Sequence, residues 1–303
     1  MGRMSRRRWG AAATAVSVTG VAGLAYALWE AQQYTLRRID VPVLPPGAHD
    51  LRILHISDVH LTADQPRKVA WLRSLADLRP DLIVNTGDNL AALDSVPVVL
   101  DAFEPLFDVP AVYVFGSNDY YAARPKNPAR YLLPDKKKRI HGRDLPWDDL
   151  DIAFRAVGWT NVSNTRTELV VAGQHVAIVG VDDPHLDLDR YPEVDRPWAA
   201  DAVLRIGVAH APYLRVVDAM AADGVDVVFS GHTHGGQLCV PGFGALVTNC
   251  DLPRRQASGL SHRCGAWLHV SAGLGTSPYT PVRFACRPEA TLLTLTAAPG
   301  ADA

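Results

Sequence analysis

The feature of this chain that most constrains its fold is a series of Asp and His residues, each placed directly after an apolar run of β-type residues. In chain order the runs and the residues that follow them are 51–56 with Asp58 and His60, 82–85 with Asp88, 111–115 with Asn118 and Asp119, 206–209 with His210, and 225–229 with His232 and His234. Open α/β folds keep their ligands at the carboxyl ends of strands. We therefore expect these side chains to gather in one site.

The residue types in this series indicate a metal site. Carboxylate, amide and imidazole groups suit Mn, Fe or Zn, and the absence of thiolates from the series argues against a structural zinc knot. On extended backbone, Asp58 and His60 would project to the same side and reach one ion, and the same holds for His232 and His234. A carboxylate such as Asp88 can bridge two ions. Two cations about 3.5 to 4 Å apart can lower the pKa of a bridging water and clamp an in-line displacement at phosphorus.

The polar residues also form five ordered blocks. These blocks are Asp58-Val59-His60, Gly87-Asp88, Gly116-Ser117-Asn118-Asp119, His210 and Gly231-His232-Thr233-His234. In this order the chain resembles the calcineurin-like metallophosphoesterases, whose pattern is D-x-H, G-D, G-N-H-[DE], a single His and G-H-x-H. The run GHTHGGQ at 231–237 resembles the membrane-associated branch of that family. The resemblance spans about 51–296 and implies a four-layer α/β/β/α sandwich.

The resemblance also implies a ligand set for two divalent metal ions, with Mn²⁺ favoured and Fe, Zn and Mg as further candidates. Asp58, His60 and His234 would hold one ion, and Asp88 would bridge to the other. The second ion would take Asn118, His210 and His232. The catalytic residues expected on this basis are Asp88, Asp119 and His232.

The third block departs from the family pattern, because Gly116-Ser117-Asn118-Asp119 lacks the usual His. Two interpretations are open. In the first, which we prefer, Asn118 still binds the metal and Asp119 takes the position of the His. In the second, Ser117 replaces the ligand and Asn118 replaces the His. That His is thought to stabilise transition-state charge or protonate the leaving group, contributions of about 10²- to 10⁴-fold.

Two further segments lie near these blocks in the sequence. His185 follows Asp182-Asp183-Pro184 at another strand end that could face the same cleft, with a helix cap or turn as the alternative interpretation. The basic stretch 122–143 would attract a phosphorylated substrate or anionic lipid, unless it is a solvated loop. Tyr120, Arg124 and Lys126 are the substrate-binding candidates there.

The N-terminal segment has the pattern of a membrane helix. Residues 9–28 carry no charge and follow Arg3, Arg6, Arg7 and Arg8. A helix of that length spans roughly 30 Å, and the positive-inside rule places the remainder of the chain outside the cytoplasm. The sequence Ala25-Tyr26-Ala27 resembles a cleavage site, so export after removal of a signal peptide is the alternative.

The segments give a domain organisation. We expect an anchor or signal at 1–29, a Pro-containing connector at 30–49, a catalytic domain at 50–296 and a loose tail at 297–303. The formal net charge of −2 argues against a nucleic-acid polymer as partner. The four cysteines, all in the last quarter, lack the paired spacing of a zinc site.

The expected function is that of a single-pass membrane protein with an extracytoplasmic, dinuclear metal-dependent phosphoesterase domain. A metal-activated hydroxide would hydrolyse a phosphoester or pyrophosphate bond. Nearness to the membrane favours a phosphorylated, lipid-linked substrate, such as one of the nucleotide-diacylglucosamine type. The alternative is a catalytically weak or inactive metal-binding surface module that lost turnover with the missing His.

Overall fold

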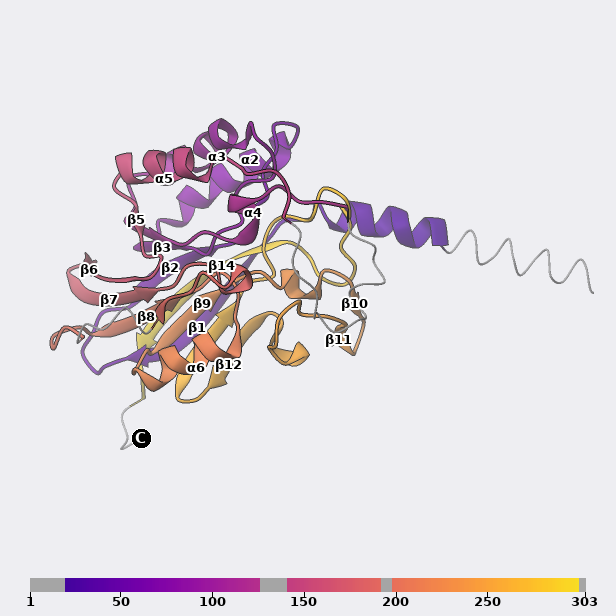
Figure 1. Ribbon diagram of the computed structural model, residues 1–303. Helices are drawn as coiled ribbons and strands as arrows, with labels where there is room; N and C mark the ends of the chain where they lie inside the picture. Colours follow the sequence, from indigo (N-terminus) through magenta and orange to yellow (C-terminus); the bar gives the residue numbers. More distant parts are fainter. Residues whose placement is uncertain (1–19, 126–140, 192–197, 300–303) are drawn as a thin grey trace, which may run out of the picture.

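Two six-stranded sheets form the centre of the protein (Figure 1). The computed structural model describes residues 20–125, 141–191 and 198–299. In spatial order the first sheet contains β1 (Thr35–Leu44), β14 (Glu289–Ala297), β2 (Leu51–Ile56), β3 (Leu82–Asn85), β4 (Ala111–Tyr113) and β5 (Thr160–Asn161). The second contains β12 (Gly259–Arg263), β13 (Ala266–Val270), β9 (Val227–Ser230), β8 (Leu204–Val208), β7 (Gln174–Gly180) and β6 (Thr165–Val171).

Most neighbouring strands in both sheets are parallel. In the first sheet β2, β3, β4 and β5 run parallel, as do β1 and β14, whereas β14 and β2 are antiparallel. In the second sheet β13, β9, β8 and β7 run parallel, and β12 and β6 pair antiparallel at its two edges. The carboxyl ends of the parallel strands in each sheet therefore share one edge, which is where an open α/β fold places its site.

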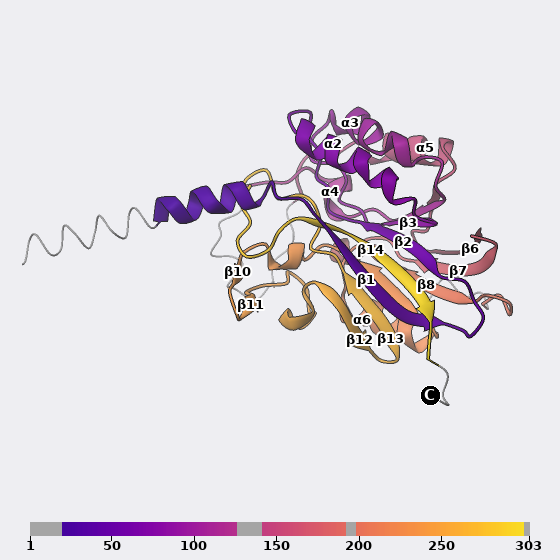
Figure 2. The ribbon, with the colours of Figure 1, turned by 180° about the vertical axis from the view of Figure 1, so that it is seen from behind.

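Helices cover the outer face of each sheet. The helices α2 (Pro66–Ser74), α3 (Ser95–Phe103) and α5 (Trp147–Ala156) pack on the first sheet, and α6 (Leu214–Ala222) packs on the second (Figures 1 and 2). Between the sheets lies a separate apolar cluster, in which Ile53 and Val84 of the first sheet meet Ile206 and Phe229 of the second. The layers thus follow the expected order of helix, sheet, sheet and helix.

The predicted strands and helices are found with small changes at their ends. The strands at 51–56 and 82–85 have the predicted bounds, and β4 ends two residues before the predicted 115. The apolar pattern of residues 67–78 predicts a helix, and the structure has α2 there, followed by a 3₁₀ turn at Leu75–Leu78. Apolar runs were sufficient to locate these strands, because β2, β3 and β4 are buried on both faces.

The prediction that 30–49 only connects an anchor to the domain is wrong. Residues Thr35–Leu44 form β1, which pairs in parallel with β14 along its length. Val41 and Leu44 are buried in the cluster between the sheets. The prolines favoured a connector, but Pro42 is tolerated because β1 is an edge strand and has a ladder partner on one side only.

Residues 20–30 form a helix that projects from one end of the domain (Figures 1 and 2). Within 20–125, 141–191 and 198–299, no helix has the length and apolar character needed to cross a bilayer. Residues 9–19 of the predicted membrane segment lie outside the described residues.

Candidate metal centre

Asp58 and His60 lie in the loop after β2, and both side chains are buried. The loop is held by backbone hydrogen bonds, with Asp58 N–H donating to Gly87 O at 2.9 Å and His60 N–H donating to Asp88 O at 2.9 Å. The extended backbone expected here is not found, because φ is 50° at Asp58 and 45° at His60. Both side chains nevertheless reach one cluster, through a left-handed turn.

Asp88 follows β3 and lies at the centre of the cluster. Its Oδ2 is 3.5 Å from His60 Nε2 and 3.6 Å from His210 Nε2. The backbone N–H of Asn118 donates to Asp88 Oδ1, and the Asn118 side-chain amide donates to Oδ2, both at 2.7 Å. One carboxylate thus contacts histidines that arrive from different sheets, which is the position expected of a bridging ligand.

Three histidines are each oriented by a backbone carbonyl. His210 donates from Nδ1 to Thr86 O at 2.7 Å, and His234 donates from Nδ1 to Gly275 O at 3.2 Å. His232 donates from Nε2 to Asn249 O at 3.2 Å. In each ring the other nitrogen faces the cluster: His210 Nε2 is 3.3 Å from His232 Nδ1, and His234 Nε2 is 3.6 Å from Asp58 Oδ1. A carbonyl on one ring nitrogen fixes the tautomer in which the other can bind a metal.

Four of these residues can hold a single ion. One ligand atom from each of Asp58, His60, Asp88 and His234 lies within 4.8 Å of the others. Their nitrogen and oxygen donors suit a borderline or hard divalent cation. His60 Nε2 is buried and has no hydrogen-bond partner in the described structure. A buried imidazole nitrogen without a partner is costly, and a metal ion would satisfy it.

The charges of the cluster also fit a cation. Burial lowers the pKa of His60 to about 4 and the pKa values of His232 and His234 to about 3, so these rings are neutral at pH 7. Neutral imidazole is the form that binds metals. Burial also opposes protonation of His210, but the carboxylates of Asp88 and Asp183 raise its pKa to about 9. The negative charge that retains this proton would be neutralised by a bound cation.

Two glycines allow the loops to approach the cluster. A Cβ at Gly116 would lie 2.3 Å from Asp88 Oδ1 and 2.5 Å from His210 Nδ1. A Cβ at Gly231 would lie 1.8 Å from Ser57 Oγ and 2.4 Å from Asp58 Oδ2. Any side chain at either position would displace a ligand. This explains why glycine precedes both the Asn118 loop and the His232 turn.

The sequence profile of the family described as "Calcineurin-like phosphoesterase" matches residues 51–236, the part of the chain that supplies all these ligands. The chain belongs to this family. It is therefore a metallophosphoesterase, an enzyme that hydrolyses phosphoric esters.

Relatives match almost the whole chain. YpbG of Bacillus subtilis (strain 168) is 28% identical over 286 residues, covering 90% of this chain and 98% of that protein. Phosphodiesterase YaeI of Escherichia coli (strain K12) is 26% identical over 299 residues, covering 96% and 99%. A protein of Bos taurus named "Transmembrane protein with metallophosphoesterase domain" is 27% identical over 309 residues. That alignment covers 95% of this chain but 63% of the bovine protein, so this chain spans less than two thirds of it.

Solved structures align with this chain at low sequence identity. The 5'-nucleotidase precursor of Thermus thermophilus has 17% identity and a TM-score of 0.47, covering 81% of this chain and 55% of that chain. The phosphopantetheinyl hydrolase of Mycobacterium tuberculosis has 13% identity and a TM-score of 0.40, covering 80% and 96%.

Within this phosphoesterase, Asp119 does not occupy the position expected of a proton donor. It is fully buried in α4 (Ser117–Tyr120), where Oδ2 accepts the N–H groups of Asp88 at 2.7 Å and Gly116 at 3.0 Å. Its Oδ1 accepts those of Asn89 at 2.7 Å and Leu90 at 3.0 Å. Both oxygens are therefore engaged with the backbone of the metal loops. These contacts argue against the interpretation that Asp119 replaces the missing His, although burial and the nearby Asp88 carboxylate raise the pKa of Asp119 to about 7. That role stays a prediction, whereas the Asn118 side chain does lie beside Asp88.

The structure describes two of the three substrate-binding candidates, Tyr120 and Arg124. Tyr120 donates its hydroxyl to Asp182 Oδ1 at 2.8 Å and packs on Trp147, so its polar atom is used within the protein. Arg124 is exposed and donates to His141 O at 3.3 Å. Lys126 and the basic stretch from 126 to 140 lie outside the described residues. The binding roles of Tyr120, Arg124 and Lys126 stay predictions.

His185 lies in a turn and its ring also lies beside a candidate metal ligand, so both interpretations of this residue apply. The carboxylate of Asp183 caps a 3₁₀ turn by accepting the His185 N–H at 2.8 Å. The His185 ring also lies beside His232, with ring centroids 4.4 Å apart. Asp183, for which no role was predicted, is buried, and its carboxylate helps to raise the pKa of His210. The sequence feature that could have indicated Asp183 is its position at the end of a predicted strand, the same feature that pointed to His185.

Arg283 also supports the site, although no role was predicted for it. This arginine is fully buried, and its Nη2 donates to Ala272 O at 2.7 Å, Gly273 O at 3.0 Å and Gly275 O at 2.7 Å. The same Nη2 lies 3.4 Å from His234 Nδ1. Arg283 therefore fixes the loop whose Gly275 carbonyl orients His234. It belongs to no motif, so no local sequence pattern marks it.

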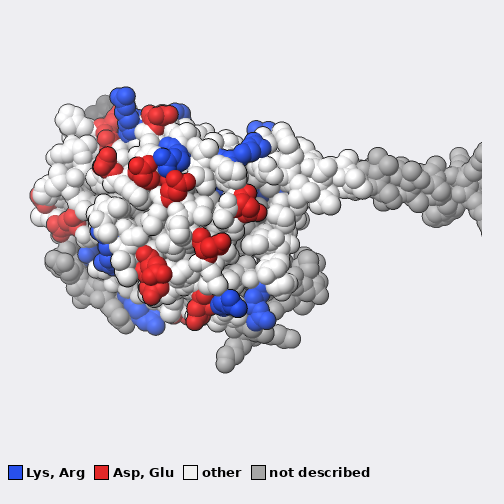
Figure 3. Space-filling view, turned by 90° about the horizontal axis from the view of Figure 1, so that it is seen from above, with Lys and Arg blue, Asp and Glu red and all other residues white. Residues whose placement is uncertain are grey.

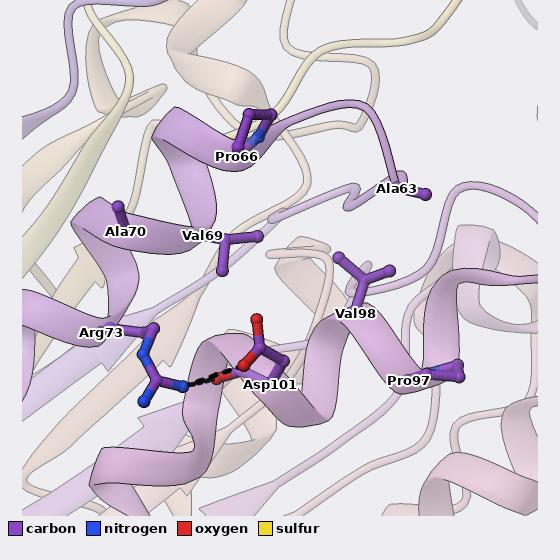
Figure 4. A pocket seen from close by; sticks show the side chains of 8 residues that line it. All are labelled: Ala63, Pro66, Val69, Ala70, Arg73, Pro97, Val98 and Asp101. Atoms are coloured by element: carbon purple, nitrogen blue, oxygen red, sulfur yellow. Dashed lines mark hydrogen bonds and ion pairs between the residues drawn. The ribbon is translucent and has the colours of Figure 1, made fainter.

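A surface hollow of about 410 Å³ lies between α2 and α3, away from the metal ligands (Figure 4). It is lined mainly by Pro66, Val69 and Val98, with an ion pair between Arg73 and Asp101 at 3.1 Å. No residue that lines it belongs to the ligand set. The hollow therefore offers no catalytic groups, and the metal cluster is the candidate active site.

Proposed function

We propose that the protein is a dinuclear phosphoesterase that hydrolyses a phosphodiester or pyrophosphate bond of a lipid-linked substrate at a membrane surface. The observation that carries the dinuclear part is the position of Asp88. Its Oδ2 lies 3.5 Å from His60 Nε2 and 3.6 Å from His210 Nε2. The same oxygen thus lies within 3.6 Å of His60, from the proposed first ligand set, and of His210, from the proposed second ligand set.

The residues of the cluster have distinct parts in this proposal. Asp58, His60 and His234 would hold one ion, Asn118, His210 and His232 the other, and Asp88 both. Bound divalent cations would lower the pKa of a water and neutralise charge that develops on the phosphoryl oxygens. The backbone carbonyls behind His210, His232 and His234 keep these rings in place. Mn²⁺ is the favoured ion.

The absence of the usual His from the Asn118 loop restricts which leaving groups a substrate can have. Asp119 is committed to backbone amides, so it is not available to protonate a leaving group. An ester whose leaving group is a good one needs no acid. Pyrophosphates and activated diesters meet this condition because a phosphate or phenolate departs as a stable anion. This supports them over alkyl monoesters.

The membrane part of the proposal rests on the N-terminal segment. Residues 9–28 are uncharged and follow four arginines, which favours a single-pass anchor with the catalytic domain outside the cytoplasm. A relative of similar sequence is named as a transmembrane protein with a metallophosphoesterase domain. The GHTHGGQ run supports assignment to the membrane-associated branch. Export after signal cleavage is the alternative.

The first test compares wild type with Asp88→Asn as full chains in detergent, stripped of metal and reloaded with Mn²⁺. Bis-p-nitrophenyl phosphate serves as the activated diester and p-nitrophenyl phosphate as the monoester. We expect Asp88→Asn to lower diester hydrolysis by at least about 10²-fold, because both ions lose a ligand. Asp218→Asn, at a partly exposed carboxylate on α6 that pairs with Arg263, is the matched control and should keep full activity.

Metal content separates the alternatives. The proposal expects two ions per wild-type chain by mass spectrometry, with the second lost in His210→Ala. If wild type binds the ions but leaves both esters intact, the protein is the inactive metal-binding module instead. If it hydrolyses the diester with one ion, the dinuclear part is wrong while the phosphoesterase assignment stands.

A further inference from the structure

Several large apolar side chains are exposed at the end of the domain that carries β10 (Cys239–Val240) and β11 (Gly244–Ala245). Gln237 Nε2 donates to Thr280 O at 2.9 Å, which places Tyr279 at the same end. We call this surface the apolar end face and define it by Leu238, Val240, Phe243, Leu246 and Tyr279, all of which are exposed. Phe243 is 61% and Tyr279 54% exposed. Apolar residues gathered on one surface mark an interaction site more often than scattered ones do.

The apolar end face is joined to the projecting helix of residues 20–30. Leu238 forms a bridge with Phe284, and the ring of Phe284 packs edge-on against Tyr26 at 5.4 Å. The backbone N–H of Arg283 donates to Ala27 O at 3.0 Å. These contacts tie the helix to the hairpin, and Figures 1 and 2 show both at the same end of the molecule.

The end of the helix is held by a buried carboxylate. Glu30 accepts the N–H groups of Ala285 at 2.9 Å and Cys286 at 3.1 Å and is almost fully buried. Beyond this contact the helix leaves the domain with Val21, Leu24 and Trp29 exposed. The orientation of the helix relative to the hairpin is thereby fixed at its last turn.

Basic side chains border the apolar end face. Arg254 and Arg255 are exposed in the 3₁₀ turn Arg254–Gln256, and the guanidinium of Arg254 lies 5.0 Å from the ring centroid of Phe243. Residues 20–29 contain no charge. By contrast, the helix-covered face seen from above carries acidic and basic side chains interspersed (Figure 3). Aromatic and aliphatic groups beside arginines are the combination that suits an anionic lipid surface.

We propose that the apolar end face rests on the outer surface of an anionic phospholipid bilayer, with Phe243 and Tyr279 among the acyl chains and Arg254 and Arg255 at the headgroup phosphates. This inference rests on the anchor in the proposed function. The uncharged run 9–28 includes residues 20–28 of the described helix, which projects from the end of the domain that carries the hairpin. An anchor in this run would therefore make the hairpin the part of the domain nearest to the membrane. Leu238 lies four residues after His234, so this contact would place the metal ligands beside the lipid headgroups.

The test uses the full chain reconstituted in vesicles of equimolar phosphatidylcholine and phosphatidylglycerol, with photoreactive p-benzoylphenylalanine in place of Phe243. The matched control carries the same group in place of Ile152, which is 66% exposed on α5 of the helix-covered face. After irradiation, intact-mass spectrometry measures the phospholipid adduct. We expect at least about tenfold more adduct at 243 than at 152, because only the former would reach acyl chains.

A second experiment tests whether the charges of Arg254 and Arg255 contribute to the contact with anionic lipid. Arg254→Glu combined with Arg255→Glu should lower the adduct at 243 about tenfold in the anionic vesicles, and pure phosphatidylcholine should lower it similarly. Equal adduct at 243 and 152 overturns the proposal. Crosslinks from 243 to a second chain overturn it in favour of a contact between copies. Failure of the chain to float with vesicles overturns both it and the anchor.

The catalytic proposal is measured separately in the same samples. Hydrolysis of bis-p-nitrophenyl phosphate does not require the bilayer contact, and the double Arg variant should retain it. Loss of diester hydrolysis in every sample, with lipid adduct still specific to 243, would refute the catalytic proposal and support the membrane contact. If no lipid adduct forms while hydrolysis persists, the membrane contact is refuted and the catalytic proposal is supported.

Discussion

Asp119 shows how a single residue supports the metal loops without touching a substrate. Its carboxylate accepts four backbone N–H groups, three from the Asp88 loop and one from Gly116. These donors are buried together with Asp119 itself. Removal of the acceptor would leave them unsatisfied, at a cost of about 1 to 3 kcal/mol for each buried polar group.

We predict that Asp119→Ala lowers the free energy of unfolding by about 3 to 5 kcal/mol, and that Asp119→Asn lowers it less because one acceptor oxygen remains. Urea denaturation of the metal-free chains measures this. Asp101→Asn, at an exposed carboxylate on α3, should change stability by less than about 0.5 kcal/mol. If Asp119→Ala unfolded like wild type, the structural role would be refuted.

Lys68 gives a prediction about pH. Its ammonium is buried and donates to Val59 O at 2.8 Å, in the loop that carries Asp58 and His60. Burial, with the charge of Arg283, lowers the pKa of Lys68 from 10.5 to about 7. The unfolded chain therefore binds more protons between these two values, and this residue makes stability rise with pH across that window.

We predict that Lys68→Met removes most of this rise. The slope that it abolishes is at most about 1.4 kcal/mol per pH unit. Urea denaturation of wild type and variant at about pH 7.5 and about pH 9 provides the comparison, since that interval lies within the titration window. Parallel pH profiles would show that the amine is not held in a perturbed state.

At the scale of secondary-structure elements, β1 shows that the domain begins near Thr35. It adds an edge strand to the first sheet and buries Val41 and Leu44 between the sheets. Arg37 on this strand pairs with Glu289, which is 252 residues away in sequence. Glu289 also accepts the N–H of Ala272 at 3.0 Å, in the loop behind the metal ligands. The strand therefore belongs to the domain that positions the site.

We predict that Leu44→Ala lowers the free energy of unfolding by about 2 to 5 kcal/mol, through lost burial and the cavity it leaves. Arg38→Ala, at an exposed position on the same strand, should have an effect below about 0.5 kcal/mol. Thermal and urea denaturation measure both. If this segment were only a connector, both substitutions would change the free energy of unfolding by similarly small amounts. That result would contradict the assignment of β1 to the core.

At the scale of the whole molecule, the metal cluster joins the two sheets. Asp58 and Asp88 follow β2 and β3 of the first sheet, whereas His210 and His232 follow β8 and β9 of the second. Ions held between them bind the folded chain and not the unfolded one, because the ligands are far apart in sequence. Metal binding should therefore stabilise the whole domain.

We predict that chelation lowers the melting temperature and that Mn²⁺ restores it. At a free metal concentration of 100 times the dissociation constant, the stabilisation is about 2.7 kcal/mol per site. Calorimetry with chelator, and then with added Mn²⁺, measures this shift. Asp88→Asn should respond much less, and an equal response in that variant would place the stabilising ion elsewhere.

Much of the site was predictable from the sequence because its ligands lie at the ends of short, strongly apolar strands. Asp58, His60, Asp88 and His234 come together as one cluster. The backbone geometry was not predictable, since φ is positive at all four of these residues and also at His232. Such left-handed turns are stabilised by surrounding loops rather than by the residue types themselves.

The sequence by itself determined most of the strands and helices, the four residues Asp58, His60, Asp88 and His234 that form the candidate metal site, and the family, because each is encoded in local periodicity or in short spaced motifs. Only the tertiary structure decided that Asp119 faces inward, that β1 belongs to the first sheet and that Arg283 supports His234. It also decided that the projecting helix lies against the β10–β11 end. Each of these depends on contacts between segments distant in the chain, and no local pattern of residues specifies which distant segment will be the partner.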